Sequence, residues 1–310
     1  MLKNSIKVMF GNLGLVWKSL LYKLVSLIVS IGLVSPLIVP VVTNLARGGF
    51  FQRLNQVFGD LVFNINLTSL VENVKNLSTD FSQIITSNNQ VALVIISIIL
   101  GVVIYYFFNS LLKNAVLGSV MSFMSSYAKT TFFGNYLTDF KKSVTLAGIK
   151  LLIELPFLVI IIVLSVLTFI GLSTLPVLAM FMTIACFTVL ISLKTTIFAG
   201  FETSVYIHNY SVMECFKCSL KILKNKGLKI FSDNIFITIF ELFTNLLMIM
   251  LTACVGLIIT IPLFMLANVC YNAVVYYDYN GMRYYLDSNN IFTPKKLEEK
   301  DSFNKIKNII

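Results

Sequence analysis

Residues 91–112 read VALVIISIILGVVIYYFFNSLL, a run without a single charged side chain. An apolar helix of about 20 residues is long enough to cross the hydrocarbon core of a bilayer. Four further runs carry almost no charge, and the last of them has room for two such helices. They are Leu24–Ala46, Leu151–Leu172, Pro176–Leu193 and Ile235–Val275. The pattern predicts an all-α polytopic membrane protein, with six transmembrane helices and additional amphipathic helices at the interface.

The overall composition excludes an ordinary soluble domain. Apolar residues make up 57% of the chain, charged residues make up 12%, and the mean hydropathy is +0.86. Soluble domains carry about 25% charged residues. Within a bilayer a helix satisfies its own backbone hydrogen bonds, so the composition and the apolar runs point to the same fold class.

Basic residues are distributed unevenly over the connections. Of the 24 Lys and Arg residues, 21 lie in alternate connections and near the chain ends, whereas loop 47–89 holds three. Basic residues stay on the cytoplasmic side, so this asymmetry predicts cytoplasmic N and C termini. The net charge of +10 is therefore first a topology signal. Its scattered, membrane-proximal positions argue against nucleic acid as a partner and favour membrane lipid, including anionic lipid.

These signals divide the chain into three parts. Residues 1–23 form a basic amphipathic lead, which we expect to lie as a helix in the cytoplasmic interface. Residues 24–277 form the six-span membrane domain, in which the external loop 47–89 has apolar residues at helical spacing and should be helical. Residues 278–310 form a cytoplasmic tail, with a charged helix expected after Pro294.

Two pairs of spans are expected to be hairpins. The first has its turn at Gly171–Pro176, where glycine, serine, threonine and proline gather. The second should turn near Cys254–Gly256, because a run of its length fits two spans rather than one. Ser211 and Glu214 form a capping box that should begin a basic amphipathic helix before this second hairpin.

The chain shows no catalytic or metal-binding motif. Its single histidine, His208, lies in a basic connection, and there is no nucleophile elbow, zinc-protease or phosphate-binding motif. Cys215 and Cys218 form a C-x-x-C pair, for which the sequence offers no second pair of ligands. We therefore expect no catalytic residue, no metal and no cofactor. The remaining cysteines, expected in apolar spans, are Cys186, Cys254 and Cys270.

Glu154 and Glu241 are the only acids inside the predicted spans. Ionisable groups within a bilayer are costly, so they usually face the interior of the helix bundle and pair. Glu154 lies one helical turn after Lys150, and Lys194 in another span is at a similar depth. The simpler interpretation is an ion pair near the interface, and a functional role stays open.

Glu241 is the deeper of the two acids. Thr238 and Asn245 share its helix face, and the next span offers Asn268 and Asn272, four residues apart. We predict that these five side chains form one polar patch in the cytoplasmic half of the bundle. The patch could consist of interhelical hydrogen bonds that fix packing, or it could line a cavity for a substrate or an ion.

Three stretches carry a resemblance to known proteins. They are GNYLTDFKKSVTLAGIK (134–150), FETS (201–204) followed by MECFKCSLKILKNK (213–226), and YYDYNGMR (276–283). The chain resembles the six-span bacterial membrane families that include the membrane domain attached to some glycerophosphodiester phosphodiesterases. The resemblance implies a bacterial cytoplasmic membrane. In those enzymes the chemistry belongs to a separate soluble barrel, so the resemblance transfers no catalytic residue.

Three functions follow as hypotheses. The first is non-enzymatic handling or transport of a lipid or other amphiphile, which the polar patch and the basic interfacial helices favour. The second is a membrane scaffold or accessory subunit of a larger complex, with the external loop or cytoplasmic helices as docking surfaces. The third, an intramembrane enzyme, is disfavoured by the missing motifs. A cavity that reaches Glu241 would favour the first over the second.

Overall fold

The computed structural model describes residues 1–63, 67–87, 90–127, 132–138, 140–172, 175–208, 212–252, 255–287 and 289–294. Six of its helices are long and apolar enough to cross a membrane. The predicted all-α polytopic membrane protein with six spans is therefore confirmed. The spans are Gly14–Arg47, Val91–Ser126, Ser143–Gly171, Val177–Ile207, Val212–Thr252 and Leu257–Asn280.

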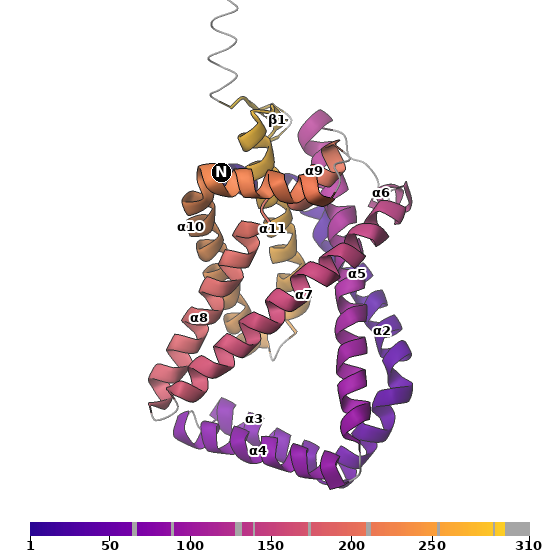
Figure 1. Cartoon of the computed structure of the whole chain (residues 1–310), viewed down its shortest axis with the longest axis vertical. Helices are drawn as coiled ribbons and strands as arrows, with labels where there is room; N and C mark the ends of the chain where they lie inside the picture. The colour runs from indigo at the N-terminus through magenta and orange to yellow at the C-terminus, as the bar shows by residue number, and fades with distance from the viewer. Residues whose placement is uncertain are drawn as a thin grey trace, which may run out of the picture. The chain divides into compact units, whose positions relative to one another are not determined.

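Figure 1 shows the helices and short strands of the described part of the chain and labels most of them. The predicted turn of the first hairpin is confirmed, since one helix ends at Gly171 and the next begins at Pro176. In chain order the elements are α1 (Leu2–Gly11), α2 (Gly14–Arg47), α3 (Phe50–Phe63), α4 (Leu67–Ser87), α5 (Val91–Ser126), α6 (Phe132–Thr138), α7 (Phe140–Gly171), α8 (Pro176–Ile197), α9 (Phe201–His208), α10 (Val212–Thr252), α11 (Leu257–Asn280), β1 (Tyr284–Tyr285) and β2 (Ile291–Phe292).

Two compact units make up the chain, and the first is built around α11. It contains Met1–Lys23, Asn109–Phe157 and the described residues from Thr188 onward. α11 contacts α1, α9 and α10. It is the most buried of the six spans, because its neighbours cover it on several sides. Its fully or almost fully buried side chains include Leu266, Cys270, Tyr271, Val274, Val275 and Tyr276.

The second unit contains Leu24–Phe108 and Leu158–Phe187. Here the predicted external segment is helical, as expected, and forms α3 and α4, which lie against each other. The rings of Phe50 and Phe81 are 5.7 Å apart, and Arg53 forms an ion pair with Asp80. This ion pair raises the pKa of the Arg53 guanidinium. A small apolar cluster joins α4 to the end of α2 and the start of α5, through Val41, Leu45, Ile85, Leu93 and Val94.

The N-terminal lead differs from its prediction in where its helices divide. Residues 1–23 were expected to form one interfacial helix, followed by a span from Leu24. Instead α1 ends at Gly11, and α2 runs without interruption from Gly14 to Arg47. Glycine is an unfavourable residue in a helix, and Gly11 and Asn12 provide the break. Between Gly14 and Leu24 no glycine or proline separates the basic segment from the span.

α10 consists of two helical segments in one continuous element. Lys226 has φ −135° and ψ 15°, outside the helical region, and the chain bends there (Figure 1). The first segment is the predicted basic amphipathic helix, and the second is the fifth span. The predicted second turn falls between Thr252 and Leu257, where residues 253 and 254, and with them Cys254, lie outside the described residues.

The tail contains a feature that the sequence did not indicate. β1 and β2 form a short antiparallel hairpin, with Tyr284 opposite Phe292. Tyr284 is fully buried, although the prediction placed it in the cytoplasmic tail. The helix expected after Pro294 lies outside the described residues.

Tyr284 ties the two ends of the described chain together. Its hydroxyl donates a hydrogen bond to Asp278 Oδ1 at 2.9 Å and accepts one from Asn4 Nδ2 at 3.0 Å. Burial, the largest cause, raises the pKa of Tyr284, and the neighbouring Asp278 raises it further. The hydroxyl therefore stays protonated and can donate to the carboxylate at any ordinary pH.

We predict that Tyr284→Phe loosens α1. The change leaves Asn4 and Asp278 without this partner in a buried site, which should cost about 1–3 kcal/mol. Thermal unfolding of the protein in a mild detergent measures the loss, and limited proteolysis measures the release of residues 1–11. Tyr285→Phe is the matched control, because Tyr285 packs its ring on Tyr127 and is only half-buried. Equal effects of the two changes would contradict the proposed tie.

Candidate functional site

Four charged side chains from three helices meet in the first unit. Lys150 of α7 is almost completely buried and pairs with Glu202 of α9. Its Nζ also lies 3.8 Å from Oε1 of Glu154, one helical turn further along α7. Lys194 of α8 donates to the other oxygen of Glu154 at 3.0 Å. Both predicted partners of Glu154 are therefore present, and a second acid completes the group.

Gly200 allows the chain to bring Glu202 into this group. It lies between α8 and α9 with φ +78°, a conformation that residues with a Cβ rarely adopt. A Cβ at this position would also come within 2.7 Å of the Ile222 side chain and 3.1 Å of Tyr276. The tight turn places Glu202 and Thr203 in the first turn of α9, facing the ends of α7 and α8.

A polar cavity of about 100 Å³ adjoins the charged group. Lys113 of α5, Thr203 of α9 and Asn268 and Asn272 of α11 contribute to its wall, together with Glu154, Lys194 and Glu202. Thr203 is completely buried, and its hydroxyl has no hydrogen-bond partner among the described residues. The same holds for the buried Oδ1 of Asn272. The cavity therefore has both charge and unused hydrogen-bonding capacity.

The predicted patch around Glu241 is distributed over more than one place. Asn268 lies within hydrogen-bonding reach of the Glu241 carboxylate, as predicted. Asn268 and Asn272 also belong to the cavity wall, which links Glu241 to the group around Glu154. Thr238 points elsewhere, because its hydroxyl accepts a hydrogen bond from Ser192 at 3.3 Å. Asn245 has a buried Oδ1 without a partner among the described residues.

Sequence reasoning missed Lys113, Glu202 and Thr203 as members of the site. A signal was available for Lys113. Lys113, Lys150 and Lys194 stand at the expected cytoplasmic ends of three spans, and charges at one depth in neighbouring spans can share a counter-ion. Glu202 and Thr203 gave no such signal, because their position depends on the turn at Gly200.

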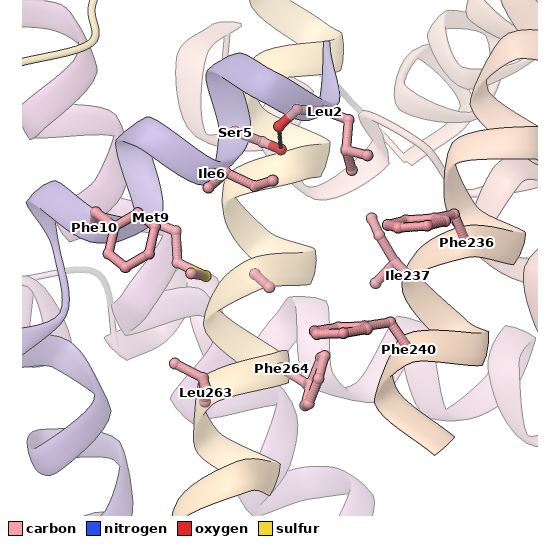
Figure 2. A pocket seen from close by; sticks show the side chains of 11 residues that line it. Leu2, Ser5, Ile6, Met9, Phe10, Phe236, Ile237, Phe240, Leu263 and Phe264 are labelled. Atoms are coloured by element: carbon pink, nitrogen blue, oxygen red, sulfur yellow. Dashed lines mark hydrogen bonds between the residues drawn. The ribbon is translucent and has the colours of Figure 1, made fainter. Parts of the chain in front are cut away.

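An apolar pocket of about 310 Å³ lies nearby in the same unit. Figure 2 shows its wall, formed by α1 on one side and by α10 and α11 on the others. Phe240 projects from α10 towards Phe264 of α11, with ring centroids 5.9 Å apart, and Phe236 projects from α10 towards the side of Leu2 (Figure 2). Among the described residues of the lining, only Ser5 has a polar side chain, and its hydroxyl already donates a 2.8 Å hydrogen bond to the Leu2 carbonyl. Leu2, Ile6, Met9, Phe10, Ile237 and Ala267 also line the pocket.

The polar cavity and the apolar pocket share α11. Ala267 lines the pocket, and its neighbour Asn268 lines the cavity. On α10, Phe240 lines the pocket and the next residue is Glu241, which Asn268 reaches. The Glu241–Asn268 pair is therefore next in sequence to a pocket residue on each of the two helices. This arrangement suits a molecule that has one apolar and one polar part.

Comparison of the chain with models of protein families, with curated proteins and with solved structures found no match. Within the described residues there is no cluster of three or more histidine, cysteine or acidic side chains that could hold a metal. The cysteines placed there, Cys186, Cys215, Cys218 and Cys270, are not in disulfides. The function must therefore be inferred from the charges and cavities described above.

We predict that Glu154→Gln destabilises the protein strongly. Lys194 would lose its carboxylate and Lys150 would keep only Glu202, and breaking a buried pair by removing one partner costs about 3–5 kcal/mol. Thermal unfolding in detergent checks this prediction. Asp80→Asn is the matched control, since it removes the same charge from a pair whose Arg53 is half-exposed. That change should have little effect, because solvated pairs contribute little. Similar losses for the two variants would rule out a special role for the buried group.

Proposed function

We propose that this integral membrane protein handles or transports a lipid or another amphiphile without chemically changing it. The observation that carries the proposal is that α11 contributes to the walls of both a polar cavity and an apolar pocket. A cavity linked to Glu241 through Asn268 is the feature that favours amphiphile handling over a purely structural patch.

The size and polarity of the two spaces support an amphiphile as the ligand. The apolar pocket, with about 310 Å³, suits part of an acyl chain and has no charged side chain in its lining. The polar cavity, with about 100 Å³, suits a head group rather than a chain. Apolar pockets with a few well-placed polar groups are the usual form of small-molecule sites. The missing catalytic motifs support handling rather than catalysis.

We place the protein in the bacterial cytoplasmic membrane, with both termini in the cytoplasm. The asymmetric distribution of basic residues supports this orientation. The proposed relation to the six-span bacterial families, carried by the three quoted stretches, supports the same membrane. In this orientation α3 and α4 are external, and the charged cavity lies in the cytoplasmic half.

A membrane scaffold or accessory subunit is the second candidate. The observation that favours it is the mutual pairing of Lys150, Glu154, Lys194 and Glu202, which could serve only to fix how α7, α8 and α9 pack. A scaffold requires no occupant of the apolar pocket. The two candidates therefore differ in whether the pocket binds a lipid.

The orientation predicts which cysteines an impermeant reagent reaches. In a variant whose five native cysteines are replaced by alanine, a cysteine at Thr79 of α4 should be labelled by a membrane-impermeant maleimide in intact cells. A cysteine at Ser302 should be labelled only after the membrane is opened. The reverse pattern would refute the proposed orientation.

The amphiphile proposal predicts that Ala267→Phe reduces lipid binding. The larger side chain would fill part of the pocket and compete with an acyl chain for the space. Mass spectrometry of lipid extracted from the purified protein should show that most of the tightly retained lipid is lost.

Ala92→Phe is the matched control, because Ala92 is an exposed residue of α5 outside the pocket. It adds the same volume and should leave the retained lipid unchanged. A wild-type protein without retained lipid, or an Ala267→Phe variant that retains as much as the wild type, would favour the scaffold instead.

A further inference from the structure

Among the described residues, the charges around the polar cavity do not balance. In their ionised forms, three lysines (Lys113, Lys150 and Lys194) face two glutamates (Glu154 and Glu202). Glu241 and Lys23 interact electrostatically and add one negative and one positive charge. They therefore leave the difference between positive and negative charges unchanged. One positive charge is therefore in excess at a place largely shielded from solvent. Charge in such a place is costly unless it is paired.

Lys113 is the lysine to which this excess belongs. Lys150 pairs with Glu202 and Glu154, and Lys194 pairs with Glu154. Lys113 forms no ion pair with a carboxylate among the described residues, although its charge acts on Glu154 and Glu241. It is only partly buried and it lines the cavity. Its ammonium group is thus the available cation at this site.

The cavity also provides hydrogen bonds that the protein itself does not use. The Thr203 hydroxyl is completely buried, lines the cavity and has no partner among the described residues. Buried polar groups are nearly always hydrogen-bonded, so such a group points to a ligand. A hydroxyl can donate to an anionic oxygen, and the amides of Asn268 and Asn272 can present donors to the same space.

We propose that the cavity binds a singly charged oxyanion carried by an amphiphile, with Lys113 as its cation and Thr203 as a hydrogen-bond donor. The single excess charge fits a phosphodiester or a carboxylate, each of which carries one negative charge at neutral pH. This inference rests on the proposed function, since it assigns the head group of the same amphiphile. The cavity takes the anion, and the chain is assigned to the apolar pocket, to which the same helix contributes Ala267.

Binding of three probes to the purified full-length protein in detergent tests the proposal. Phosphatidylglycerol carries the anion and the chains, diacylglycerol with the same chains lacks the anion, and dimethyl phosphate carries the anion without chains. The wild type should bind phosphatidylglycerol most tightly. Lys113→Gln should weaken that binding by about tenfold or more, because it removes a hydrogen bond between charged groups. Binding of diacylglycerol should not change.

Three variants separate the role of Lys113 from general effects. Lys113→Arg keeps the charge and should keep the preference for phosphatidylglycerol. Thr203→Val keeps the shape of the side chain, and it should weaken the binding of phosphatidylglycerol more than the binding of diacylglycerol. Lys224→Gln removes an exposed charge on the expected cytoplasmic side and should change nothing. Removing Lys113 leaves no carboxylate without its partner, so the Lys113→Gln protein should unfold at nearly the wild-type temperature.

The outcomes distinguish failure of this inference from failure of the proposed function. If phosphatidylglycerol and diacylglycerol bind equally well, or if Lys113→Gln binds phosphatidylglycerol like the wild type, the inference is overturned and amphiphile handling stands. Another outcome is that dimethyl phosphate binds as tightly as phosphatidylglycerol, with binding that depends on Lys113. The cavity then takes a free anion. In that case both amphiphile handling and the assignment of the anion to an amphiphile fail. If none of the three binds, both proposals fail.

Discussion

The structure depends first on the cost of placing an ammonium group inside a protein that is itself inside a membrane. Lys150 is nearly completely buried, and it can remain there only because Glu202 and Glu154 lie beside it. Glu202 lies on α9 and Glu154 lies on α7. Glu154 also forms an ion pair with Lys194 of α8. Three helices are thereby fixed relative to one another by charge. Apolar contacts alone would specify this arrangement less sharply, because lipid chains compete with them on equal terms.

This constraint also explains why the polar and apolar spaces lie together. The paired charges hold the ends of α7, α8 and α9 near α11, whose Asn268 and Asn272 complete the cavity wall. The other side of α11 is apolar and receives α1 and α10. One helix therefore has a polar and an apolar neighbourhood at the same level. A buried ion pair contributes little net stability compared with apolar packing, and its value here is in fixing positions.

The sequence was sufficient for the features that depend on local composition. The apolar runs predicted all six spans, and the helical spacing in 47–89 predicted α3 and α4. The pairing of Glu154 with Lys150 and Lys194 followed from the cost of charge in a bilayer.

The sequence was insufficient where position depends on a turn. Glu202 and Thr203 reach the cavity through the backbone conformation of Gly200. The hydroxyl of Thr238 accepts a hydrogen bond from Ser192 of another helix and so is not part of the expected patch. Tyr284 could not be expected in the core, since a two-residue strand has no periodicity to read.

The tie between Asn4 and Tyr284 has a consequence for the order in which the protein is made. α1 leaves the ribosome long before the elements that it packs on, α11 and the hairpin after it. Contacts between segments so distant in sequence form late, because the intervening chain must first be closed into a loop. The apolar pocket, which needs α1, α10 and α11 together, therefore cannot exist on a growing chain. A chain that stops before α11 would insert most of its spans and still lack both the pocket and the complete cavity, so both spaces come into being only with the sixth span.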